Sequence, residues 1–359
     1  MVGNKVHNVF LSMTPYHLLL SYGIAMTECR RSRNWLIVVA DFSNVDAYLK
    51  IMQRSDYRAF ERVMIYNGMF GIESKYARRL RVLRNVRSIR ELVRSVQIER
   101  VFIANDIRPE GQALIHFAKT AWGANCVYIE DGAAVYSSLV LPARSKIVSW
   151  LASLFCRAWW EDVRVHGTSR AIDEVRAIYP HALRPELHRV PVKKIDSSLI
   201  SRINIDRCEV NASLLRDGKA IEVDNIDAIM LLPHSQTVAK GRWLVEAVSN
   251  VLLWAQRERL VLGVKYHPRE PHQYLNSLLE NLNDRVVVIS QELPIEWVYA
   301  LRPKRLRYVF GDWSTGLLTA RWLLPNVAVF RTDTWVYEDE GLLRTFEGLG
   351  IRPFSSLLR

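Results

Sequence analysis

The sequence contains few cysteines and no long apolar run. Its four cysteines, scattered without CxxC or histidine-rich spacing, are Cys29, Cys126, Cys156 and Cys208. This distribution argues against a disulfide scaffold and a structural zinc site, and it fits buried free thiols in a reducing cytosol. A membrane-spanning helix needs roughly 18–20 apolar residues, and the longest candidate, 147–156, is too short. Because Thr14-Pro15 interrupts the apolar start before a signal peptide could form, we expect a protein that does not span a membrane.

Several motifs of common binding sites are absent from the sequence. No GxGxxG follows a first strand and no GxxxxGKS/T occurs, so neither a dinucleotide fold nor a P-loop is supported. Neither HExxH nor a clustered DxD motif is present, and we expect no metal site. The acidic residues at 338–340 lie in a late polar segment, where we expect them to cap a helix.

The composition is that of an ordinary soluble globular protein with an excess of positive charge. Hydrophobic residues make up 49% of the 359 residues and charged residues 24%, and there is no low-complexity tract. Because domains usually span roughly 100–200 residues, two compact lobes are expected. The net charge of +12 favours an anionic partner such as nucleic acid, phospholipid headgroups, an acidic carbohydrate or a nucleotide.

Much of the positive charge lies in residues 75–95. Apolar residues recur there every three or four positions, at Tyr76, Leu80, Leu83, Val86, Ile89 and Val93. This spacing predicts an amphipathic helix with arginines on its other faces. The arginines form either a solvated helix face or a patch for a membrane surface or an anionic acceptor.

Short apolar runs alternate with helical patterns along both halves of the chain. In the amino half the predicted strands are 8–13, 35–42, 62–67, 100–106, 126–131 and 163–169, the last followed by a helix at 170–180. In the carboxyl half they are 228–233, 261–268, 285–290, 307–314 and 327–330. Near-continuous apolar strands separated by helices indicate parallel sheets covered on both faces.

This alternation predicts an α/β protein with two Rossmann-like, doubly wound domains facing each other across a cleft, the GT-B arrangement. We expect an amino-terminal domain at 1–185 that binds an acceptor, a linker at 186–226, a donor-binding domain at 227–330 and a helical segment at 331–359. The linker is expected because the chain changes character over 180–226, with prolines at 180, 185 and 191 and a polar stretch.

Polar residues gather at the carboxyl ends of the predicted strands, where open α/β sheets bind ligands. They are Thr14-Pro15, Glu130-Asp131-Gly132, His234-Ser235-Gln236, His267-Pro268 and Ser314-Thr315. Gly132 lets the backbone turn sharply after the two adjacent acids. One carboxylate can then face the cleft while its neighbour is tied into the scaffold, which gives two environments and two pKa values. The alternative is a turn with solvated charges.

The later motifs also have two interpretations each. His267 is either a histidine packed at a strand end or a phosphate contact that donates a proton to a departing nucleotide. Ser314 and Thr315 either cap the following helix or bind phosphate with its first amides.

Both the motifs and their order along the chain resemble those of the bacterial GT-B sialyltransferases. This group includes lipooligosaccharide sialyltransferases and capsule polysialyltransferases. That group carries a D/E-D/E-G motif, an HP motif and a paired Ser-Ser or Ser-Thr motif, here Glu130-Asp131-Gly132, His267-Pro268 and Ser314-Thr315. The opening "FLSMTPYHLLL" is similar to the first strand and loop of the group. Glu296 stands where the group has an acid that holds the donor ribose. The resemblance covers residues 8 to about 320, with Ser-Thr in place of a strict Ser-Ser pair.

The resemblance implies an inverting transfer of sialic acid from CMP-sialic acid to a hydroxyl of a cell-surface glycan, in lipooligosaccharide or capsule, without metal or cofactor. Asp131 would be the base, with Glu130 as the second choice, and His267 the acid. His267, Ser314 and Thr315 would hold the phosphate, and Pro268 would lie beside them at the donor site. Thr14 would also lie at the donor site, and the segment from His234 through Ser235 to Gln236 would either line the pocket or form a plain turn.

Two alternatives remain. The same architecture could use another CMP-activated acid sugar such as Kdo, or the helix at 75–95 could serve a basic nucleic-acid-binding protein. The second lacks any RNP, KH or helix-turn-helix signature, so we expect no nucleic acid partner. We expect a cytoplasmic enzyme, with an anionic glycan or glycolipid acceptor and peripheral contact of 75–95 with the inner membrane.

Overall fold

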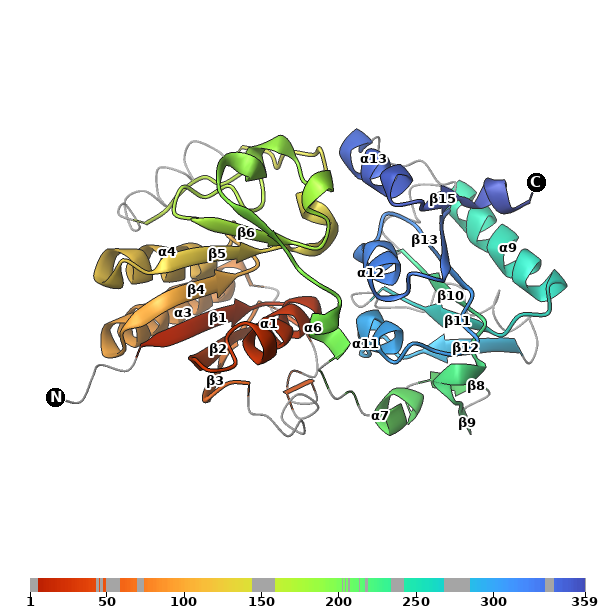
Figure 1. Ribbon diagram of the computed structural model, residues 1–359, viewed down its shortest axis with the longest axis horizontal. Coiled ribbons are helices and arrows are strands. Elements are labelled where there is room, and N and C mark those ends of the chain that lie inside the picture. The colour runs from red at the N-terminus through yellow and green to blue at the C-terminus, as the bar shows by residue number, and fades with distance from the viewer. Residues whose placement is uncertain are drawn as a thin grey trace. The chain divides into compact units, whose positions relative to one another are not determined.

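The computed structural model describes residues 6–358 apart from 43–44, 46–47, 50–58, 70–73, 144–158, 202, 204, 206, 213, 217–218, 234–241, 268–284 and 333–338. The chain divides into two compact units, Met1–Asn204 and Ile205–Arg359. Each unit is an α/β structure built on its own sheet, and Figure 1 shows the two sheets with their helices.

The first unit contains a seven-stranded sheet in the order β3-β2-β1-β4-β5-β6-β7, in which all paired neighbours are parallel. The strands are β1 (His7–Ser12), β2 (Arg33–Ala40), β3 (Arg62–Asn67), β4 (Ile98–Ile103), β5 (Asn125–Ile129), β6 (Glu174–Ala177) and β7 (Val192–Lys194). Its helices are α1 (Pro15–Thr27), α3 (Lys75–Ser95), α4 (Pro109–Trp122) and α6 (Ser198–Ser201). β1 is buried along its whole length, as expected of a parallel strand covered on both faces.

The strand order of this sheet reverses at β1. β2 and β3 extend the sheet on one side of β1, whereas β4 to β7 extend it on the other. Ligands of open α/β sheets bind beyond the carboxyl ends of the strands at such a switch point. The segments that follow β1, β4 and β5 therefore meet at the edge where a ligand is expected.

The second unit contains an eight-stranded sheet in the order β15-β14-β13-β10-β11-β12-β8-β9. Its strands are β8 (Leu214–Arg216), β9 (Lys219–Ala220), β10 (Ala228–Leu231), β11 (Leu262–Lys265), β12 (Val286–Ile289), β13 (Tyr308–Gly311), β14 (Ala328–Arg331) and β15 (Arg352–Pro353). β8 is antiparallel to β12 and β9 to β8, whereas the other paired strands are parallel. The helices are α7 (Arg207–Ala212), α9 (Arg242–Arg257), α11 (Ile295–Ala300), α12 (Thr315–Leu323) and α13 (Glu340–Gly348).

The order of the second sheet reverses at β10, with β11 and β12 on one side and β13 and β14 on the other. Aromatic side chains fill the core beside it. The ring of Trp254 from α9 packs edge-on against Phe310, 5.5 Å between centroids, and against Phe354, 6.2 Å away. This core fixes the sheet that carries the later motifs.

The ten other predicted strands are confirmed within a few residues, but the prediction for 163–180 is wrong. Residues 163–173 form turns and loops, and the strand is β6, within the stretch predicted as a helix. The carboxylate of Asp106 accepts hydrogen bonds from the backbone N–H groups of Gly167 and Ser169, both at 2.8 Å. These bonds hold the chain in a turn, so a sheet ladder does not form there.

Residues 186–226, expected as a linker, contribute β7 to the first sheet and β8 and β9 to the second. Residues 331–359 contain α13, β15 and a short 3₁₀ helix at Phe354–Leu357. Asp339 caps α13, as predicted for 338–340, by accepting from the backbone N–H of Leu342 at 3.1 Å. Within the described ranges, no helix is both long and apolar enough to cross a membrane.

Candidate active site

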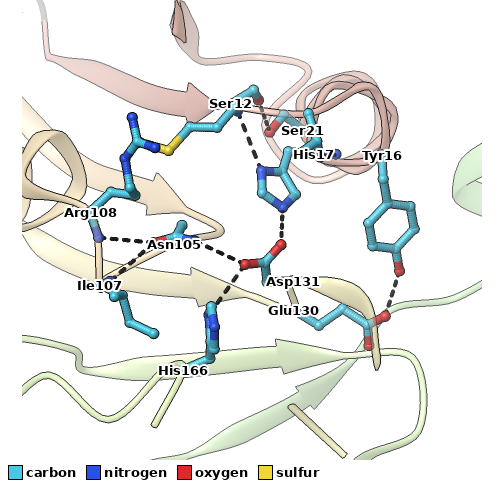
Figure 2. Close-up of polar contacts among 12 residues, drawn as sticks. Ser12, Tyr16, His17, Ser21, Asn105, Ile107, Arg108, Glu130, Asp131 and His166 are labelled. Carbon is cyan, nitrogen blue, oxygen red and sulfur yellow. Dashed lines mark hydrogen bonds and ion pairs between the residues drawn. The ribbon is translucent and has the colours of Figure 1, made fainter. Parts of the chain in front are cut away.

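Three segments at the switch point of the first sheet bring polar side chains together. Residues 14–17 follow β1, Asn105 and Asp106 follow β4, and Glu130 and Asp131 follow β5. Figure 2 shows Tyr16 directed at Glu130 and both His17 and Asn105 directed at Asp131, with His166 on the side of Asp131 opposite His17.

Glu130 is tied into the scaffold. Its side chain is 1% exposed, and it accepts hydrogen bonds from the hydroxyls of Tyr16 and Tyr136, both at 2.5 Å, and from the backbone N–H of Ile178 at 2.7 Å. Burial raises the pKa of Glu130 to about 6 although these three donors oppose the rise. All three donors lie inside the unit, so Glu130 joins α1, β5 and β6.

Asp131 is the more accessible acid, with a side chain 18% exposed. Its Oδ1 lies 2.5 Å from Nε2 of His17, whereas Oδ2 accepts from the Asn105 amide at 3.0 Å and lies 3.2 Å from Nδ1 of His166 (Figure 2). Burial by itself would raise the pKa of Asp131, but its interactions with His17 and His166 outweigh burial and hold the pKa well below its ordinary value. Gly132 has a φ of +68°, the sharp turn expected after the acids.

The position of His17 follows from the start of α1. Thr14 caps the helix, its hydroxyl accepting from the backbone N–H of His17 at 3.2 Å, and Pro15 occupies the first turn. The backbone N–H of Met13 donates to Nδ1 of His17 at 3.3 Å. Because Nδ1 accepts this bond, the ring hydrogen lies on Nε2, which faces Asp131.

His166 is placed by its loop. Asp106 is fully buried and accepts from the amides on either side of Thr168, which fixes the residues just after His166. Gly167 has a φ of +81°, and a Cβ there would lie 2.7 Å from Leu187 and 2.9 Å from the ring of Tyr128. Only glycine fits this turn, which sends the His166 side chain toward Asp131.

Sequence reasoning missed three residues of this cluster. His17 directly follows the Thr14-Pro15-Tyr16 segment after the first predicted strand. Asn105 lies at the carboxyl end of the predicted strand 100–106, where ligands are expected. Oδ1 of Asn105 accepts from the backbone N–H groups of Ile107 and Arg108, so its Nδ2 is left to face Asp131. His166 lies in the stretch wrongly predicted as a strand, and no motif around it indicated a role in a site.

In the second unit, His267 lies just beyond the end of β11. Its backbone carbonyl accepts from the side-chain amide of Gln291 at 3.4 Å. The nearby Lys265 is 5% exposed and donates to the carbonyls of Ser290 and Gln291, both at 3.1 Å. Burial lowers the pKa of Lys265 to about 8, an effect that Glu296 opposes. The predicted residues Pro268, His234, Ser235 and Gln236 lie outside the described residues.

Ser314 and Thr315 follow β13 on the other side of the central strand β10. Ser314 caps α12 by accepting from the backbone N–H of Gly316 at 3.1 Å, and Thr315 is the first residue of the helix. Because β11 and β13 both pair with β10 in parallel, His267 and Ser314 leave the same edge of the sheet, on strands about 10 Å apart.

Glu296 lies in the first turn of α11 and is buried, 8% exposed. Burial raises the pKa of Glu296, while Lys265 and the hydroxyl of Thr319 favour its charged form. Its side chain thus lies near the ends of β11 and β12. No group of three His, Cys, Asp or Glu side chains in the described part of the chain is arranged to hold a metal ion.

The chain matches a known protein family over most of its length. The family model described as alpha-2,8-polysialyltransferase matches residues 8–330, from β1 to β14. The chain belongs to the alpha-2,8-polysialyltransferase family. It is therefore a member of a glycosyltransferase family, and the resemblance found in its motifs is confirmed.

Solved structures similar to this member of the family confirm the α/β GT-B fold. A UDP-GlcNAc 2-epimerase from Neisseria meningitidis bound to UDP-GlcNAc has a TM-score of 0.56 at 12% identity, covering 95% of this chain and 91% of that one. A putative UDP-N-acetylglucosamine 2-epimerase from Listeria monocytogenes has a TM-score of 0.56 at 13% identity, covering 96% and 88%. A UDP-glucosyltransferase from Polygonum tinctorium has a TM-score of 0.51 at 12% identity, and the match covers 98% of this chain and 86% of that one.

One curated protein is similar over a short stretch. Elongation factor-like GTPase 1 from Homo sapiens is 29% identical over 109 residues, which is 28% of this chain and 9% of that protein. This polysialyltransferase-family chain has no GxxxxGKS/T phosphate-binding motif, so the short match does not carry GTPase chemistry to it.

Proposed function

We propose that the protein transfers sialic acid from CMP-sialic acid, with inversion, to a hydroxyl of a cell-surface glycan such as lipooligosaccharide or capsule. The family match over 8–330 carries this proposal. Because the family is named for an α2,8 linkage, we further propose that the acceptor ends in sialic acid. Such an acceptor is anionic, which agrees with the net charge of +12.

The first unit supplies the acceptor side of the reaction. The acceptor hydroxyl must lose its proton as it attacks, and a positioned base accelerates such a step by about 10²–10⁴-fold. Of the two acids, Asp131 is 18% exposed and Glu130 is 1% exposed. The cluster around Asp131 is therefore the place where the acceptor hydroxyl would be activated, with Glu130 holding the scaffold.

The second unit supplies the donor side. The N-terminus of α12 presents backbone amides beside the hydroxyls of Ser314 and Thr315, and helix N-termini favour phosphate. His267 would contact the CMP phosphate and give a proton to the departing group. Together these groups would neutralise the phosphate, so we propose a reaction that needs neither metal nor cofactor.

The test is CMP release from CMP-sialic acid in the presence of EDTA, with oligosialic acid and galactosides as acceptors. We expect acceptor-dependent release from the intact protein, lost in His267→Ala. CMP-Kdo is the matched donor control and is expected to be a poor substrate. If the protein neither binds CMP nor releases it with any acceptor, the proposal is wrong.

We also propose that α3 contacts an anionic membrane surface. It carries eight basic residues and one acidic residue, Glu91. Val86, Ile89 and Val93 are buried against the unit, whereas the side chains at the start of the helix are exposed: Tyr76 by 79%, Leu80 by 57% and Leu83 by 53%.

Exposed apolar side chains among arginines suit the boundary between headgroups and acyl chains, and they favour a membrane over nucleic acid, which contacts charge and stacked rings. We expect the protein to bind vesicles containing phosphatidylglycerol and not vesicles of phosphatidylcholine alone. Leu80→Glu combined with Leu83→Glu should abolish binding. Leu253→Glu, at a leucine 54% exposed on α9, should leave binding unchanged. Salt-sensitive binding to RNA without vesicle binding would contradict this proposal.

A further inference from the structure

We infer that Lys265 is a positioning residue of the donor site, and that its buried ammonium holds His267 in place relative to the Ser314-Thr315 pair. This inference rests on the proposed sialyl transfer, in which these groups hold the CMP phosphate. Lys265 belongs to none of the motifs that indicated the site. Its role is to place other groups rather than to contact the substrate.

Lys265 is the last residue of β11, two positions before His267. Its side chain lies in the interior, and a buried ammonium is costly unless it is paired and hydrogen-bonded. Burial lowers the pKa of Lys265 to about 8, so at pH 7 most of the side chain still carries its charge and three N–H donors. The groups around this ammonium therefore show what it holds.

The first of these groups is the turn after β12. Nζ of Lys265 donates to the carbonyls of Ser290 and Gln291, both at 3.1 Å. The Ser290 carbonyl also accepts from the backbone N–H of Leu293 at 3.2 Å, which closes the turn. The side-chain amide of Gln291 reaches back to β11 and donates to the carbonyl of His267 at 3.4 Å. Lys265 and Gln291 thus tie the end of β11 to the turn after β12.

The second group is α11, which begins directly after this turn. Glu296 in its first turn is buried, and both Lys265 and the hydroxyl of Thr319 on α12 favour its charged form. α11 packs against α12 (Figure 1). A Cβ on Gly316, in the first turn of α12, would lie 3.4 Å from the side chain of Ile295. The beginnings of the two helices are therefore in contact.

These contacts join the two halves of the proposed phosphate site. β11 and β13 lie on opposite sides of β10. A chain of contacts runs from His267 through Gln291 and Lys265 to α11. From α11 it continues to the start of α12, where Ser314 and Thr315 lie. Because a displacement of about 1 Å can greatly slow a reaction that depends on positioned groups, loss of the ammonium should affect donor binding and transfer together.

The experiment compares the wild type with Lys265→Met, which keeps an unbranched side chain and removes the charge. Arg285→Met is the matched control, because Arg285 is exposed at the other end of β12 and donates to the carbonyl of Arg259. Calorimetry gives the Kd of CMP, and acceptor-dependent CMP release gives kcat and KM. We expect Lys265→Met to weaken CMP binding about fivefold and to lower kcat about tenfold. The KM for oligosialic acid should be unchanged, and Arg285→Met should match the wild type.

A double-mutant cycle tests whether Lys265 acts through His267. His267→Ala removes the imidazole that the ammonium helps to place. If Lys265 acts on binding largely through that imidazole, the two substitutions are not additive. We expect Lys265→Met to weaken CMP binding only about twofold in the His267→Ala protein, the remainder coming from the Ser314-Thr315 side.

Lys265→Gln covers the case in which methionine unfolds the second unit. Its side chain is shorter and uncharged but keeps a donor, and we expect CMP affinity to fall here too. A folded Lys265→Met or Lys265→Gln protein with the CMP affinity and kcat of the wild type overturns the inference. An equal loss of CMP affinity with and without His267 also overturns it. A wild type that neither binds CMP nor releases it would instead refute the proposed function.

Discussion

Glu130 gives a quantitative test of how the site is built. Its carboxylate accepts three hydrogen bonds inside the first unit and is almost completely buried. Replacing it by glutamine keeps the shape and removes the charge. The Tyr16 hydroxyl can turn to accept from the new amide, because a hydroxyl both donates and accepts.

The magnitude follows from the raised pKa of Glu130. Its pKa is about 6 in the folded protein, against an ordinary value of 4.5. The fold therefore holds the proton more tightly than the unfolded chain does. The stability contributed by protonated Glu130 is complete below about pH 4.5 and is lost as the pH rises through 6. The difference amounts to about 2 kcal/mol, and Glu130→Gln has no such loss.

The assay is urea unfolding at several pH values, followed by hydrogen exchange of peptides from β5 and β6, which report on the first unit alone. Between about pH 4 and 7.5, the free energy of unfolding of the wild type should fall by about 2 kcal/mol relative to Glu130→Gln. Glu99→Gln, at an exposed position of β4, is the matched control. A gap between wild type and Glu130→Gln that stays constant, or that shifts in the opposite direction, would refute this reasoning.

Three further predictions concern the supports of the two sites. Gly167→Ala should destabilise the first unit by about 1–3 kcal/mol because of the positive φ and close neighbours, whereas Gly348→Ala, with nothing within 4 Å, should not; urea unfolding would separate them. Asp106→Asn leaves one of two buried amides without an acceptor, and a thermal melt should show a loss of about 1–3 kcal/mol. Lys265→Met removes the two hydrogen bonds that the Lys265 ammonium donates beside His267 and should weaken CMP binding about fivefold in calorimetry, for a loss of about 1 kcal/mol; an unchanged Kd would argue against that support.

The strands could be predicted because buried parallel strands are continuous apolar runs. β1, β4 and β10 each lie within a few residues of their predicted positions, and parallel pairing then places the motifs at one edge of each sheet. The helix at 75–95 was predicted for a different reason, the recurrence of apolar residues every three or four positions, and it is α3. Periodicity did not reveal that only its second half is covered. That depends on where α4 begins, since Asn85 in the middle of α3 already lies beside Glu110 in the first turn of α4.

The failure at 163–180 has a specific physical cause. "VRVHGTS" alternates like a strand, but the buried carboxylate of Asp106, some sixty residues away in the chain, takes two of its amides. β6 lies in a segment with a helical pattern because β5 and β7 offer it pairing partners on both sides. Neither interaction is local, so a local pattern could not indicate it.

By itself, the sequence determined that two acids and a glycine end a strand, that a histidine and two hydroxyls end later ones, and that the chain folds as two α/β units. Only the tertiary structure decided which acid is buried in the scaffold, Glu130, and which is the more accessible one, Asp131. Glu130 and Asp131 are adjacent, so their side chains leave the backbone in different directions. α1, more than a hundred residues earlier, sets Tyr16 beside the first and His17 beside the second. A carboxylate takes its chemistry from its neighbours, and here those neighbours come from distant parts of the chain.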